Sequence, residues 1–165
     1  MRNFKIFQII SSFTKDELRD FENFIQSPYL TSSRDYTPIL KVIYTYSNNW
    51  ERLQEINNEE FYKLIFPGKS YSNKTLRNRL TELTILAKKF IIQKTLEKDT
   101  TQNNLLFLKG LKDRKLYNIF RNEFERINDT IDKDELKSYT GVEIKMLSAY
   151  AYMENQDFGL SFDSF

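Results

Sequence analysis

Positively charged side chains are concentrated in one stretch of the chain. Residues 63–94 contain eight Lys and Arg residues against one acid, Glu82, which gives the stretch a net charge of +7. Lys and Arg bind phosphate groups, and Arg and Asn also hydrogen-bond to the edges of bases. The composition of this stretch therefore raises the hypothesis of nucleic-acid binding.

A helix-turn-helix is the specific form of this hypothesis. The first helix is expected at residues 58–66, the turn at 67–72 and the recognition helix at 74–98. The candidate contacts to nucleic acid are Lys69, Lys74, Arg77, Asn78 and Lys88. Three features argue against the helix-turn-helix hypothesis. The turn is long, and the second helix is much longer than a usual recognition helix. The whole chain also has a net charge of only +2. Nucleic-acid binding is thus the alternative interpretation and not the leading one.

The simpler interpretation of the basic stretch is a solvated helix face or an internal counterpart to acidic residues. Residues 116–165 contain ten acidic and five basic side chains, a net charge of −5. This acidic final third is the obvious partner within the same fold.

The side chains needed for most catalytic and metal sites are missing from the sequence. The chain contains no Cys and no His, which excludes disulfides, thiolate nucleophiles, Cys/His zinc sites and Ser-His-Asp triads. Gly68-Lys69-Ser70 resembles the end of a phosphate-binding loop, but Lys63 stands where that motif requires Gly. The carboxylates of residues 129–135 lack the spacing and the central Gly of a calcium loop. We therefore predict a protein that is not an enzyme, with no catalytic, cofactor-binding or metal-binding residue.

Helix start signals recur along the chain. In a capping box, a Ser, Thr, Asn or Asp side chain caps the helix and a Glu three residues later reaches back to it. The chain repeats this pattern with a flanking apolar pair, in the pairs Thr14/Glu17, Asn57/Glu60, Asp132/Glu135 and Thr140/Glu143. The last two lie too close together for both to begin long helices.

The helix start signals, together with the absence of strand signals, predict an all-α fold of six to eight helices. Val occurs only twice and no stretch alternates between apolar and polar residues, so no strand is expected. The expected helices span residues 3–12, 15–26, 38–46, 58–66, 74–98, 102–111, 115–129 and 142–155. We predict an orthogonal or antiparallel bundle in residues 1–100, followed in residues 101–165 by the start of a helical hairpin similar to a repeat.

The apolar pattern of residues 74–98 predicts a long central helix. Its main seam consists of Leu76, Leu80, Leu83, Ala87 and Phe90, at the spacing of one helix face. Leu86 and Ile91 widen this seam, whereas Ile85 and Ile92 fall on the opposite side, which predicts a helix packed on two sides. In residues 115–129 the apolar face consists of Leu116, Phe120, Phe124 and Ile127. Small residues at Ser148, Ala149 and Ala151 mark a place for close helix approach.

Two short segments of the sequence are distinctive. They are FENFIQSPY at residues 21–29 and FPGKSYSN at residues 66–73, the latter followed by Leu76-Arg77-Asn78. They resemble the N-terminal region of a family of large, functionally uncharacterised, all-helical bacterial proteins, in which hairpins similar to tetratricopeptide repeats follow. The resemblance implies an all-helical fold and a bacterial cytoplasmic setting, and it supplies no activity, ligand or site residue. Leu30 stands where Phe is commoner in the family.

The end of the sequence is unusually apolar for a chain terminus. Phe158, Leu160, Phe162 and Phe165 fall within eight residues, and these form the candidate interaction surface. We expect either a fragment of a longer protein or a face covered by another chain. The alternative is a tail that folds back onto its own domain. No run approaches about 18 apolar residues, so no membrane span is expected, and the cytoplasm is the expected location.

The leading functional interpretation is therefore a protein-interaction or scaffold module. It is expected to bind a protein partner, or a second copy of itself, through an exposed apolar helical face.

Overall fold

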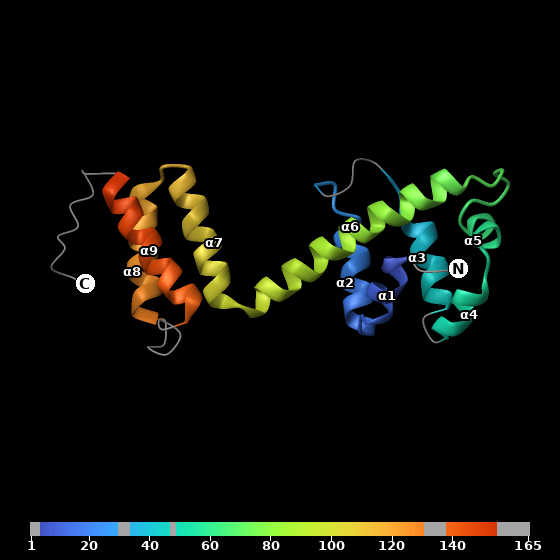
Figure 1. The fold of residues 1–165 in the computed structure, drawn as a ribbon, viewed down its shortest axis with the longest axis horizontal. Coiled ribbons are helices and arrows are strands. Elements are labelled where there is room, and N and C mark those ends of the chain that lie inside the picture. Colours follow the sequence, from blue (N-terminus) through green and yellow to red (C-terminus); the bar gives the residue numbers. More distant parts are fainter. Residues whose placement is uncertain (1–3, 30–33, 47–48, 131–137, 155–165) are drawn as a thin grey trace. The chain divides into compact units, whose positions relative to one another are not determined.

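The computed structural model describes residues 4–29, 34–46, 49–130 and 138–154, and all regular structure in these ranges is helical (Figure 1). The predicted all-α class is confirmed, with nine helices in the described ranges where six to eight were expected. These are α1 (Lys5–Ser11), α2 (Lys15–Ile25), α3 (Thr37–Thr45), α4 (Trp50–Glu55), α5 (Asn58–Ile65), α6 (Asn73–Lys98), α7 (Thr100–Asp113), α8 (Tyr117–Thr130) and α9 (Tyr139–Glu154).

The additional helix is α4, which is only six residues long. Asn49 caps it, because its side-chain oxygen accepts a hydrogen bond from the Arg52 N–H at 3.2 Å. So short a segment spans less than two turns, and it therefore shows no apolar periodicity that a sequence pattern could reveal.

Two predicted capping boxes are present in the structure. At the start of α2, the Thr14 hydroxyl accepts from the Glu17 N–H at 3.1 Å, and the Glu17 carboxylate accepts from the Thr14 N–H at 2.9 Å. At the start of α5, Asn57 and Glu60 make the same reciprocal pair at 2.9 and 3.2 Å. Each box satisfies backbone donors that the helix itself leaves unpaired.

The box predicted at Thr140 is wrong. Helix α9 begins at Tyr139, one residue before the predicted cap. The Ser138 hydroxyl accepts a hydrogen bond from the Gly141 N–H at 3.2 Å. Thr140 therefore lies in the first turn, and its hydroxyl points to Gln102 of α7, at 3.5 Å. The signal predicted at Asp132 lies outside the described residues.

The chain forms two compact units, residues 1–93 and residues 94–165. We call them unit 1 and unit 2. The boundary between the two units falls within α6, whereas the predicted domain boundary was at residue 100.

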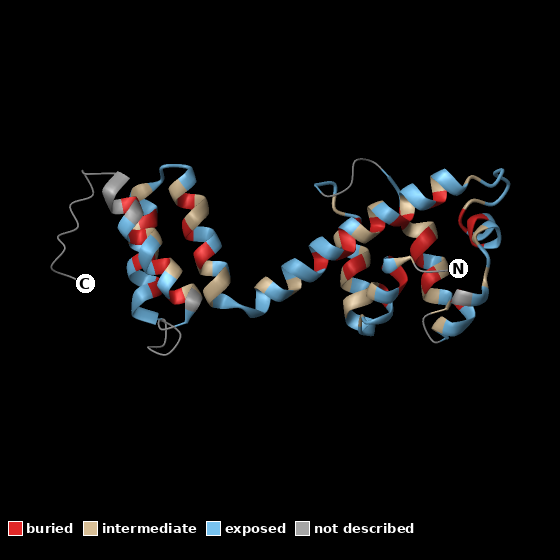
Figure 2. Cartoon of the chain, viewed as in Figure 1, coloured by how far each residue is buried: buried red, intermediate tan, exposed pale blue. Residues whose placement is uncertain are grey.

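Unit 1 is built around one face of α6. Figure 2 shows the buried residues of α6 along one side of the helix; they are Leu76, Leu80, Leu83, Leu86, Ala87 and Phe90. Core residues from α1 to α5 complete the cluster, and these include Ile10, Phe21, Leu40, Leu53 and Phe61. The predicted main seam of α6 is thus confirmed.

The prediction that α6 packs on two sides is wrong. Ile85, Ile91 and Ile92 are 51%, 40% and 58% exposed. At about 100° per residue, Ile85 and Ile92 point away from the seam. One long face of α6 is therefore open to solvent.

In unit 2, α7 packs against both α8 and α9. Figure 1 shows that α7 runs antiparallel to α8 and parallel to α9. The core consists of Leu105, Leu108, Leu111, Phe120, Phe124, Ile127, Ile144 and Ala151. Leu116, expected on the apolar face of α8, is exposed because it precedes the first turn of that helix.

The small residues of α9 allow its close approach to the core. Ser148 and Ala151 are buried, as the sequence indicated, whereas Ala149 faces solvent. Ile144 lies on the same buried side of the helix. The Lys109 ammonium and the Glu143 carboxylate form an ion pair at 3.0 Å between α7 and α9.

Candidate functional site

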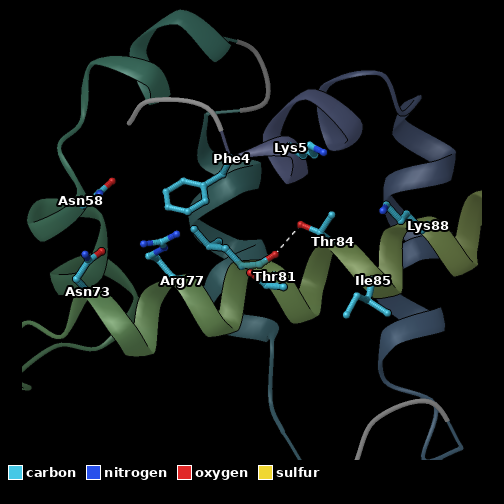
Figure 3. A pocket seen from close by; sticks show the side chains of 10 residues that line it. Phe4, Lys5, Asn58, Asn73, Arg77, Thr81, Thr84, Ile85 and Lys88 are labelled. Carbon is cyan, nitrogen blue, oxygen red and sulfur yellow. Dashed lines mark hydrogen bonds between the residues drawn. The ribbon is translucent and has the colours of Figure 1, made fainter.

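A cavity of about 570 Å³ lies beside the buried seam of α6 in unit 1. Helix α6, the start of α1 and the start of α5 enclose it (Figure 3). Its lining residues are Phe4, Lys5, Asn58, Asn73, Arg77, Leu80, Thr81, Thr84, Ile85 and Lys88. We call this cavity the α6 groove.

The one-sided burial of α6 positions most of the groove side chains. Arg77, Thr81 and Lys88 fall within about 40° of one another on the helix, beside the buried seam. The start of α1 brings Lys5 to the groove, and the start of α5 brings Asn58. Figure 3 shows Asn58 and Arg77 toward one end and Lys88 toward the other.

The groove is strongly cationic. Lys5, Arg77 and Lys88 line it, and no carboxylate of the described residues does. These three cations form no ion pair with any carboxylate in the part of the chain that the structure describes. The Asn58 and Asn73 amides and the Thr81 hydroxyl add hydrogen-bonding groups. The site can therefore bind an anion through charge and several hydrogen bonds.

Glu82, the single acid of residues 63–94, is engaged away from the groove. Its carboxylate accepts hydrogen bonds from the Arg34 guanidinium and, at 2.9 Å, from the Tyr36 hydroxyl. Arg79 lies 3.8 Å from it. Partial burial favours the neutral acid, but the bonds from Arg34 and Tyr36 and the charges of Arg34 and Arg79 outweigh it and hold the pKa of Glu82 below its ordinary value.

We expect the Glu82→Gln variant to remove part of the acid sensitivity of unit 1. A carboxyl with a lowered pKa in the folded state stabilises the fold above its unfolded pKa of about 4.5, and this contribution is lost as the pH falls through the folded pKa. Because Arg34 is half exposed, the expected loss at pH 7 is about 1 kcal/mol or less. Urea unfolding at several pH values measures it.

The control is Glu55→Gln, because the Glu55 carboxylate forms no ion pair among the described residues. The stability difference between wild type and the Glu82 variant should shrink on acidification below about pH 4.5. A difference that stays constant over the whole acid range would contradict the assigned ion pair.

The structure brings together only part of the predicted nucleic-acid contacts. Arg77 and Lys88 line the α6 groove. Lys74 and Asn78 are exposed on α6 outside the groove lining, and the Lys69 ammonium lies 5.7 Å from the centre of the Phe66 ring. Lys5 was not among the predicted contacts, because only the tertiary packing of α1 places it near α6.

A second exposed feature lies in unit 2. Leu106 and Phe107 of α7, and Val142 and Met146 of α9, are large apolar side chains open to solvent. At about 100° per residue, Leu106 lies roughly opposite the buried Leu108 on α7, and Met146 lies roughly opposite the buried Ser148 on α9. Phe107 and Val142 lie about 100–120° from the same two buried residues. We call these four residues the outer apolar face.

The predicted surface of Phe158, Leu160, Phe162 and Phe165 lies outside the described residues. In the described ranges, no cluster of acidic side chains is suited to hold a metal ion. None of the helices within those ranges is long and apolar enough to cross a membrane.

Comparisons of the chain with family models, with curated proteins and with solved structures gave no match.

Proposed function

We propose that the chain is a non-enzymatic protein-interaction module that binds its partner through unit 2. The observation that carries the proposal is the outer apolar face. Leu106, Phe107, Val142 and Met146 remain exposed although the core of unit 2 is formed without them. Exposed apolar side chains that form one surface are characteristic of interaction sites, and we propose that these four residues form such a surface.

The arrangement of unit 2 supports this proposal. In helical repeats, an antiparallel helix pair is followed by a helix that packs in parallel on the first, and the exposed sides of these helices form the binding surface. Helices α7, α8 and α9 have this order and these directions. Leu105 and Ile144, both buried, are 39 residues apart, within the usual range of repeat lengths.

The partner that fits this surface is a protein with an apolar face of its own, such as an amphipathic helix. A second copy of the chain is the other occupant to be tested, and the apolar residues of segment 158–165 are proposed to extend the surface. The cytoplasm of a bacterium, implied by the family resemblance, is the proposed setting. Nucleic-acid binding would use unit 1 and does not compete with this function.

The test compares capture of proteins by the immobilised chain and by a Phe107→Glu/Met146→Glu variant. We expect the variant to retain less than about a tenth of the specific partner, since charges in an apolar interface cost more than 1.4 kcal/mol. Quantitative mass spectrometry of proteins captured from the source cell measures the ratio. Light scattering on the isolated chain measures self-association at the same time.

The matched control is Asn118→Glu/Asn122→Glu, which adds the same charge at two exposed polar positions of α8. This control should capture the partner as the wild type does. Equal capture by all three proteins, together with a monomeric wild type, would refute the assignment of the outer apolar face.

A further inference from the structure

We propose that the α6 groove binds a single strand of nucleic acid, with its cations on successive phosphates. This proposal concerns unit 1 and is independent of the protein-interaction function of unit 2. It also changes the helix-turn-helix hypothesis, because it places the ligand beside α6 and against the starts of α1 and α5.

The charge of the groove selects an anionic ligand. Lys5, Arg77 and Lys88 converge on one cavity, whose lining contains no carboxylate from residues 4–29, 34–46, 49–130 or 138–154. The nearest acid in the sequence of α6, Glu82, is held by Arg34 and Tyr36 and does not line the groove. Phosphate groups are anions that Lys and Arg bind through charge-assisted hydrogen bonds.

The spacing of the cations selects a ligand with more than one phosphate. Arg77 and Lys88 are eleven positions apart on α6, which corresponds to about 16 Å along the helix axis. One phosphate cannot lie against both side chains, whereas consecutive phosphates along a strand can follow the helix. Lys5, from α1, adds a third cation to the same path.

The remaining lining suits bases better than a bare polyanion. The Asn58 and Asn73 amides can hydrogen-bond to base edges, and Phe4 and the half-exposed Ile85 offer apolar contacts. Figure 3 shows Phe4 and Arg77 among the side chains that line the groove. Unpaired bases are the ones whose faces and edges are available for such contacts.

The volume of the site favours one strand over two. A cavity of about 570 Å³ is of the size that holds a small ligand or a few nucleotides, and it does not admit a duplex. A duplex would instead lie on the open face of α6, where Lys74, Asn78 and Lys89 are exposed outside the groove. The two binding modes therefore depend on different side chains.

The experiment is a titration of a labelled single strand of about a dozen nucleotides with the full chain, followed by fluorescence anisotropy. DNA and RNA strands of mixed sequence are used. If three phosphates are neutralised, the affinity should fall roughly twentyfold between about 50 and 200 mM salt. A duplex of the same length is titrated in parallel and should bind more weakly.

Two pairs of variants distinguish binding in the groove from attraction to the general positive charge of α6. Lys88→Glu should weaken binding at least tenfold, whereas Lys89→Glu, which makes the same change outside the lining, should change it less than threefold. Thr81→Trp should block the groove at unchanged charge, whereas Asn78→Trp on the open face should not. Circular dichroism confirms that each variant keeps the helical content of the wild type.

Several results would overturn the proposal. No binding of either strand at low salt excludes it, and equal losses in Lys88→Glu and Lys89→Glu show that the charge of α6 acts without the groove. Tighter binding of the duplex, sensitive to Asn78→Trp, assigns the helix-turn-helix mode instead. If pyrophosphate or a mononucleotide competes for the groove as effectively as the unlabelled strand, the groove is a small-ligand pocket.

Discussion

The Phe21→Ala variant should lose about 3–5 kcal/mol of the unfolding free energy of unit 1, which is a large part of the stability of a domain of this size. Phe21 is fully buried. Its ring lies 5.6 Å from that of Phe13 and 5.3 Å from that of Phe90, measured between centroids. Truncation removes these contacts and leaves a cavity between α2 and α6, and both effects oppose folding.

The single Trp of the chain makes this change measurable in unit 1 alone. Trp50 lies in α4 and packs against the core of unit 1, so its fluorescence reports the unfolding of this unit. The melting temperature should fall by at least about 12 °C. Tyr29→Ala is the control, because Tyr29 is 95% exposed and its loss should cost less than about 0.5 kcal/mol. Equal shifts in the two variants would contradict the assigned core.

The second large effect is expected in unit 2 from overpacking. Ala151 is buried on the same side of α9 as Ser148, so Ala151→Phe forces a ring into a space that holds one methyl group. Such insertions cost about 1–3 kcal/mol, and more where a helix must move. Helix α9 should separate from the rest of unit 2. Amide hydrogen exchange in residues 142–150 should accelerate at least tenfold.

The neighbouring alanine offers a matched comparison. Ala149 differs from Ala151 only in facing solvent, and Ala149→Phe makes the same chemical change on the same helix. Exchange in the Ala149 variant should remain within about twofold of the wild type. Acceleration in both variants, or in neither, would show that α9 does not pack through Ser148 and Ala151.

Local features of the sequence predicted much of the fold. A capping box needs only residues three positions apart, and the boxes at Thr14 and Asn57 are present in the structure as predicted. The same logic failed at Thr140, because Ser138 offers a competing cap two residues earlier. Periodicity identified the buried seam of α6, but it could not show that no described helix covers Ile85 and Ile92.

The candidate groove could be predicted only in part. The positive charge of residues 63–94 led to the prediction that Arg77 and Lys88 are binding residues, and both line the groove. Lys5 and Asn58 join them only through contacts between α1, α5 and α6, and no spacing in the sequence encodes such contacts. The sequence also could not show that Glu82 is held by Arg34, 48 residues away, and does not line the groove.

The outer apolar face can be tested most directly by site-specific photocrosslinking. The chain contains no Cys, so a single substitution gives one labelling site for a benzophenone group. With Met146→Cys on the outer apolar face, illumination in an extract of the source cell should give a discrete covalent adduct, at least about tenfold more than with Asn118→Cys on α8. Excess unlabelled wild-type chain should suppress this adduct, and excess Phe107→Glu/Met146→Glu chain should not. The same adducts from both positions, or none from Met146→Cys, would contradict a binding function for this face.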